Sequence, residues 1–81
     1  MADENKKLKP GRRMALRILD EEAYRRILAG NAPKTLSDFG SQLAAWFKNT
    51  YPAAPEVSEK LVEQAIASTW HRRHEIIGSE L

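Results

Sequence analysis

The sequence predicts an all-α (mainly) fold, a small three-helix bundle preceded by a flexible basic N-terminal arm. The chain has 81 residues, the size of one domain with a modest core. Apolar residues recur at helical spacing in three segments. Breaks in this pattern at 9–11, 30–35 and 51–58 separate the segments. A single core needs the Leu, Ile, Val, Phe and Trp of all three segments. We therefore expect an arm over 1–11 and one helical domain over 12–81.

The first helix is expected at about 12–29. Its apolar positions follow helical spacing at Leu16, Leu19, Ala23, Ile27 and Leu28. Gly30 then stands where a helix commonly ends. The Met, Ala, Leu and Arg residues of this stretch favour helix over strand.

A short N-terminal strand at 13–19 is the alternative for the start of this segment. Apolar Met14, Leu16 and Ile18 alternate with Arg13, Ala15 and Arg17, which is the period of a strand. Asp20 would then cap a shorter helix over 21–29. Both interpretations remain open from the sequence.

The second helix is expected at about 36–50, with Thr35 or Ser37 as its N-cap and Asp38 in its first turn. One stripe of this helix contains Leu36, Phe39, Leu43, Trp46 and Phe47. Gly40 in its interior costs roughly 1 kcal/mol relative to Ala, so we expect a neighbouring helix to approach closely there.

The third helix is expected at about 58–77, with Ser58 as its N-cap and Gly78 at its end. Its buried face is expected to contain Leu61, Val62, Ala65, Ile66, Thr69, Trp70, Arg73, Ile76 and Ile77. Acidic residues come first and basic residues last, which suits the helix dipole.

Several classes of function are disfavoured. The chain has no cysteine, so it has neither a disulfide scaffold nor a thiolate metal site. It lacks the apolar run of a membrane span or signal peptide, and a cytoplasmic protein without a membrane partner is expected. It also lacks a Gly-rich phosphate loop and a nucleophile–base motif. We expect no enzyme activity, no cofactor and no small-molecule substrate.

The stretch "HRRHE" places His71 and His74 three residues apart on a helix. Its order differs from the His-Glu-x-x-His of a zinc-binding helix, and the two arginines between the histidines repel a dication. We therefore expect no metal site there.

Nucleic-acid binding is the specific function that the charge pattern favours. The basic residues of 1–13 are Lys6, Lys7, Lys9, Arg12 and Arg13, against two acids, whereas the rest of the chain is nearly neutral. These five residues are candidate phosphate contacts, and Arg72 and Arg73 are expected to add to them.

One geometry for DNA binding is a helix-turn-helix formed by the second and third segments. The third helix would then enter the major groove, with Ser58, Glu59, Lys60, Glu63 and Gln64 facing the bases. Lys60 suits a guanine or a phosphate, and Gln64 suits a base edge. The connection of about seven residues is longer than the usual tight turn.

A second geometry follows from the order of "RRMALRIL", "DEEAYRRILAG" and "TLSDFGSQLAAWFK" within residues 13–49. This stretch resembles ribbon-helix-helix DNA-binding proteins. The resemblance implies an obligate dimer that pairs two ribbons, and it places Arg13, Ala15 and Arg17 against the major groove. The third helix, with "LVEQAIASTWHRRHE", is similar to short uncharacterised bacterial proteins.

The sequence thus predicts a small, non-enzymatic binding protein, a DNA-binding regulator of bacterial or phage origin. The alternative is a protein–protein interaction module or phage-type inhibitor that binds a larger assembly. Tyr24, Tyr51 and an exposed tryptophan would anchor such an interface. Because the core is small, a homodimer is a further expectation.

Overall fold

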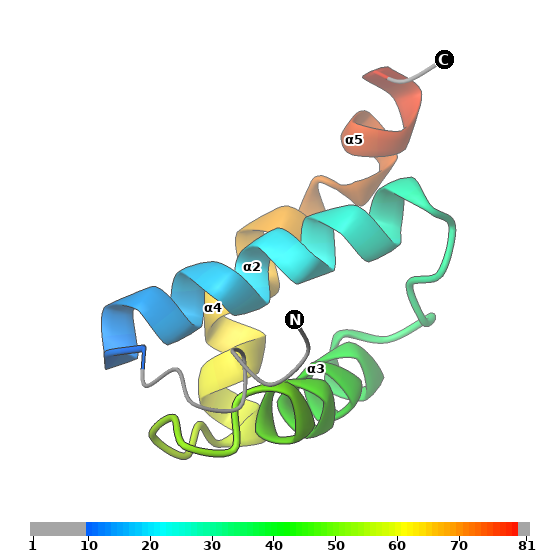
Figure 1. The fold of residues 1–81 in the computed structure, drawn as a ribbon. Helices are drawn as coiled ribbons and strands as arrows, with labels where there is room; N and C mark the ends of the chain where they lie inside the picture. The colour runs from blue at the N-terminus through cyan, green and yellow to red at the C-terminus, as the bar shows by residue number, and fades with distance from the viewer. Residues whose placement is uncertain (1–9, 80–81) are drawn as a thin grey trace.

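The computed structural model describes residues 10–79, and in this range it contains four helices and no strand (Figure 1). They are α2 (Arg12–Leu28), α3 (Leu36–Thr50), α4 (Glu59–His71) and α5 (Arg73–Ser79). The all-α class is therefore confirmed for the part of the chain that is described. None of these helices is long and apolar enough to cross a membrane. Lys6, Lys7 and Lys9 of the expected arm lie outside the described residues.

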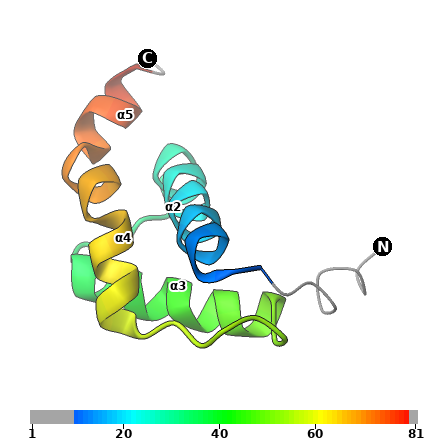
Figure 2. The ribbon, with the colours of Figure 1, turned by 90° about the vertical axis from the view of Figure 1, so that its left-hand side faces the viewer.

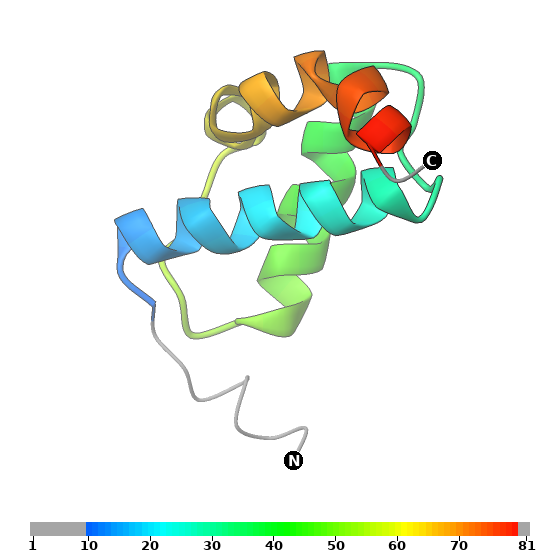
Figure 3. The ribbon, with the colours of Figure 1, turned by 90° about the horizontal axis from the view of Figure 1, so that it is seen from above.

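Helix α2 lies across α3. Helices α4 and α5 lie one after the other alongside α2 (Figures 1 and 3). Each of the four helices gives at least one side chain to a common core. The buried apolar residues are Ala15, Leu19, Ala23, Ile27, Phe39, Leu43, Phe47, Val62, Ile66, Trp70 and Ile76. At its centre the rings of Phe39 and Trp70 meet with centroids 5.7 Å apart, which joins α3 to α4.

The alternative strand at 13–19 is wrong, because α2 is helical from Arg12 onward. Asp20 therefore does not cap a helix; it lies inside α2, where a carboxylate oxygen accepts a 2.6 Å hydrogen bond from the Thr69 hydroxyl. Gly30 ends α2 as expected, with φ of 77°. The N–H of Gly30 donates to the Ile27 carbonyl and that of Asn31 to the Arg26 carbonyl, a left-handed helix end that favours glycine.

Thr35 caps the start of helix α3, because its hydroxyl accepts a 3.1 Å hydrogen bond from the Asp38 N–H. The expected close approach at Gly40 is confirmed. A Cβ at Gly40 would lie 2.6 Å from Cγ of Glu63 and 3.3 Å from the Glu59 carbonyl oxygen. The missing side chain thus lets α4 pack directly on α3, and Ser58 caps α4 by accepting from the Leu61 N–H.

The third helix is not continuous over 58–77 as expected, because it breaks at Arg72. This residue has φ of −96° and ψ of 13°, and α5 begins directly after it. One guanidinium nitrogen of Arg73 donates to the Trp70 carbonyl at 3.0 Å, so a side chain uses a carbonyl near the end of α4. After the break Ile76 is buried in the core, as expected. Ile77 is 42% exposed, so the expectation that it is buried is wrong.

Candidate functional site

The start of α2 concentrates positive charge. Its N-cap is Gly11, which offers no side chain to the free N–H groups, and its first turn has no acidic residue. Arg12 and Arg13 occupy this turn and are exposed. The positive end of the helix dipole and two guanidinium groups therefore lie together, an arrangement that attracts anions.

The other long helices begin differently. The hydroxyl of Thr35 caps α3, and Asp38 lies in its first turn; Ser58 caps α4, and Glu59 follows. In both cases side chains satisfy a backbone donor and place negative charge at the positive pole. The start of α2 is thus the exception among these three helices.

The three arginines further along α2 already have acidic partners. The Nε of Arg17 lies 3.3 Å from a carboxylate oxygen of Glu21, and Arg25 and Arg26 share Glu22 at 3.5 and 3.0 Å. Arg26 also lies over the Trp46 ring on α3, with 5.8 Å to the centroid. Arg12 and Arg13, by contrast, have no side-chain partner among residues 10–79.

The outer face of α4 presents Lys60 and Gln64, both exposed. The remaining residues expected to face bases are arranged differently. The Ser58 hydroxyl is engaged as the helix cap. Glu63 is half-buried and lies against α3 beside Gly40, which turns its carboxylate away from this face, whereas Glu59 stays exposed.

The start of α2 and the first half of α4 lie at the same end of the molecule. Figure 2 views the molecule from the side on which α2 begins, and the first half of α4 is visible beside that end. Figure 3 shows the same relation from above, with the first half of α4 next to the first half of α2. Thr69 faces α2 through its bond to Asp20, and Lys60, nine residues earlier, lies half a turn round α4 from it, so Lys60 points away from α2.

The arginines at the end of α4 have separate roles. Arg73 lies with its Cζ 4.0 Å from the centroid of the Trp70 ring and donates a hydrogen bond to the Trp70 carbonyl, so its guanidinium group is engaged within the fold. Arg72 is exposed and lines a shallow depression between α2 and α4. The depression is also lined by Asp20, Glu21, Tyr24, Arg25 and Thr69. Its acidic residues offset its basic ones, so it presents no strong charge of either sign.

A larger open groove runs beside the second half of α3 and the connection 51–58. Ala44, Phe47, Tyr51 and Val57 form its apolar part. Its polar lining residues are Ser41, Lys48, Glu56, Ser58 and Glu59. No two of these polar side chains hydrogen-bond to each other, so the groove contains no paired nucleophile and base.

The histidines of "HRRHE" are both exposed. His71 ends α4 and His74 lies in α5, so the break at Arg72 separates them onto different helices. Within residues 10–79, no three His, Asp or Glu side chains gather in a way that could hold a metal ion.

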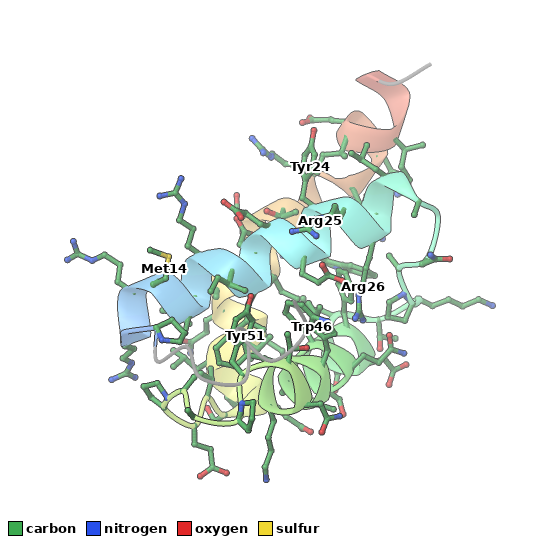
Figure 4. The ribbon with its side chains drawn as sticks, in the orientation of Figure 1. Met14, Tyr24, Arg25, Arg26, Trp46 and Tyr51 are labelled. Carbon is green, nitrogen blue, oxygen red and sulfur yellow. The ribbon has the colours of Figure 1, made fainter. Side chains whose placement is uncertain are left out.

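The aromatic anchors expected for a protein interface divide between core and surface. Tyr51 is half-buried against Phe47 and Trp46, with ring centroids 5.1 and 6.2 Å away. Trp46 is half-buried under Arg26, whereas Tyr24 is 40% exposed on α2 (Figure 4). Tyr24 is therefore the aromatic residue of this set that is available to a partner.

Comparison of the chain with protein-family models, with curated proteins and with solved structures found no match.

Proposed function

We propose that the chain binds nucleic acid by its phosphates, through the start of α2. The observation that supports this most directly is the start of α2, where exposed Arg12 and Arg13 stand on a helix end without side-chain cap or acid. Placing cations there is unfavourable for an isolated helix, because they oppose the dipole. A bound polyanion makes the arrangement favourable, since its negative charge interacts with the positive end of the dipole and with both guanidinium groups.

Further lysines accompany this helix start in the sequence. Lys6, Lys7 and Lys9 precede α2 and would add phosphate contacts to those of Arg12 and Arg13. Lys60 lies on the side of α4 that points away from α2, so the proposal does not count Lys60 or Gln64 as contacts of the same phosphates.

The proposed mode is directed at the phosphate backbone and tolerates different sequences. A strand at 13–19, which ribbon pairing requires, is replaced by α2, so the proposal does not use the ribbon geometry. It also does not require the tight turn of a helix-turn-helix, because α3 and α4 are joined by the longer connection 51–58. Arg17 and Arg73 are not counted as phosphate contacts, since Glu21 and Trp70 already engage them. The alternative role, a protein-binding module, stays a prediction.

The test is the salt dependence of affinity for a duplex of about 20 base pairs. If about four phosphates are neutralised, affinity falls about 100-fold between about 50 and 200 mM salt. Arg12→Gln/Arg13→Gln should reduce the slope of log affinity against log salt by about two.

The matched control is Lys34→Gln/Lys48→Gln, which removes the same charge from exposed positions elsewhere. This variant should keep the slope of the unchanged chain, and duplexes of unrelated sequence should give similar slopes. Absence of binding at low salt contradicts the proposal. So does an equal loss of slope in both double variants, because that would reflect net charge alone.

A further inference from the structure

Helix α2 has a second face that the fold does not use. Five exposed residues follow one another at steps of three and four: Met14, Arg17, Glu21, Tyr24 and Leu28. Steps of three and four keep side chains on one side of a helix, as in the seam of a coiled coil. The seam spans about 21 Å at 1.5 Å per residue. We call these five residues the α2 seam.

The α2 seam lies opposite the packed side of the helix. The buried residues Ala15, Leu19, Ala23 and Ile27 face the core, so α2 has apolar side chains on both sides. Met14, Tyr24 and Leu28 are 52%, 40% and 39% exposed, and among the described residues only Ile77 joins them as an exposed large hydrophobic. Figure 4 shows Met14 and Tyr24 projecting from the side of α2 that faces away from α3. Large apolar side chains exposed in a row along one helix can be buried by packing against a second helix.

The order of residues along the seam identifies a partner. Arg17 lies two positions before Leu19 and Glu21 two positions after it, while Met14 lies five before and Tyr24 five after. If two copies of α2 pair in antiparallel orientation about a twofold axis at the level of Leu19, Arg17 meets Glu21 and Met14 meets Tyr24. Parallel pairing would instead place Arg17 against Arg17 and Glu21 against Glu21. The charges therefore complement each other only in the antiparallel arrangement.

We propose that a second copy of the chain docks on the α2 seam, with the two α2 helices antiparallel about the level of Leu19. Each copy gives one Arg17 and one Glu21, which already pair within their own helix at 3.3 Å, so the four charged groups form one network with two intermolecular ion pairs at the centre of the interface. Each copy also places the Met14 sulfur against the Tyr24 ring of the other, a favourable contact. This contact occurs on both sides of the ion pairs. One helix pair is a small interface, so a dissociation constant on the order of 10⁻⁵ M is expected.

Engineered cysteines test the orientation, because the chain contains no cysteine of its own. Met14→Cys and Tyr24→Cys are prepared as separate full-length variants and mixed under mild oxidation. Antiparallel pairing brings these two positions within the roughly 7 Å that a disulfide requires. Two copies of Met14→Cys alone would hold their cysteines about 15 Å apart, since ten residues of rise separate the levels.

The proposal predicts a disulfide-linked dimer that forms at least tenfold faster in the mixture than in Met14→Cys alone or in a mixture of Met14→Cys with Lys34→Cys. Equal rates in all three samples would reflect random collision and overturn it. Faster crosslinking of Met14→Cys alone would indicate parallel pairing and also overturn it.

Charge reversal tests the same contact without oxidation, by sedimentation equilibrium of the full chain in the absence of nucleic acid. Arg17→Glu should weaken dimerisation about tenfold, because both central ion pairs become repulsive. Arg17→Glu/Glu21→Arg restores opposite charges and should restore the dimer, and Lys34→Glu should leave it unchanged. A wild-type chain that remains monomeric at about 1 mM, or a double variant as weak as Arg17→Glu, overturns the proposal. Circular dichroism of each variant verifies that α2 remains folded.

Discussion

The Thr69 hydroxyl donates a 2.6 Å hydrogen bond to a carboxylate oxygen of Asp20, which joins α4 to α2 across 49 positions of sequence. Thr69 is 7% exposed and Asp20 is half-buried, so water replaces this bond poorly. Polar partners in such a setting fix how two helices sit against each other, because a shifted arrangement would leave a buried acceptor unpaired. The bond thus helps set the position of α4, whose outer face presents Lys60 and Gln64.

Thr69→Val should lower the free energy of unfolding by about 1–3 kcal/mol, since the carboxylate of Asp20 loses its donor while the size of the side chain is preserved. Urea unfolding followed by circular dichroism measures the loss. Thr50→Val is the matched control, because the Thr50 hydroxyl bonds only to the Trp46 carbonyl one turn back in its own helix. The control should lose less than about 1 kcal/mol. Equal losses would mean that the Asp20–Thr69 bond has no special role.

The neighbouring arginines at the end of α4 should differ in their effect on stability. Arg73→Ala removes the stacking on Trp70 and the bond to its carbonyl, and should cost about 1–2 kcal/mol. Arg72→Ala removes an exposed side chain and should stay within about 0.5 kcal/mol of the unchanged chain. Urea unfolding measures both variants, and tryptophan fluorescence reports the surroundings of Trp70. A larger loss at Arg72 than at Arg73 would contradict the assigned roles.

At Gly11 stability and nucleic-acid binding should change in opposite directions. Gly11 has φ of −66° and ψ of 171°, which suits any capping residue, and a Cβ there meets no atom of residues 10–79 within 4 Å. Gly11→Asp should therefore raise the free energy of unfolding by about 1 kcal/mol, through a side-chain cap and a negative charge at the positive pole. The same charge occupies the proposed phosphate position, so duplex affinity should fall roughly tenfold.

Gly11→Ser separates the two effects, because serine caps the helix without adding charge. It should stabilise the fold by a smaller amount and keep duplex affinity within about twofold of the unchanged chain. Thermal unfolding and fluorescence anisotropy give the two readouts. If Gly11→Asp leaves affinity unchanged, the start of α2 does not contact phosphates.

Local signals in the sequence were sufficient for the helices up to Thr50. The spacing of apolar residues gave α2 and α3 nearly to their ends, and glycine marked both the end of α2 and the close approach at Gly40. Caps at Thr35 and Ser58 follow from residue type because a cap bonds to backbone only a few positions away. Each of these features depends on neighbours in sequence.

Features that depend on tertiary contacts could not be predicted from the spacing of residues in the sequence. The third helix looks continuous by periodicity, yet Arg73 stacks on Trp70 and the helix breaks at Arg72. The partner of Asp20 is too distant in sequence to infer, and Leu28, expected in the core, is 39% exposed on the outer side of α2.

For the candidate site, the sequence indicated which residues are basic but not which of them are free. The pairing of Arg17 with Glu21 follows the familiar spacing of four on a helix and could have been inferred from it. The position of Glu63 against Gly40 needed the packing of α3 on α4. A glycine before two arginines already indicates in the sequence that the start of α2 has no side-chain cap and is positively charged.

The most direct test of phosphate binding at the start of α2 is a map of backbone amide shifts by NMR as a short duplex is added at low salt. The account predicts that the largest changes occur at Gly11, Arg12 and Arg13, and that they vanish as salt is raised. Changes confined to the groove along 51–58, or no changes at any amide of α2, would contradict it.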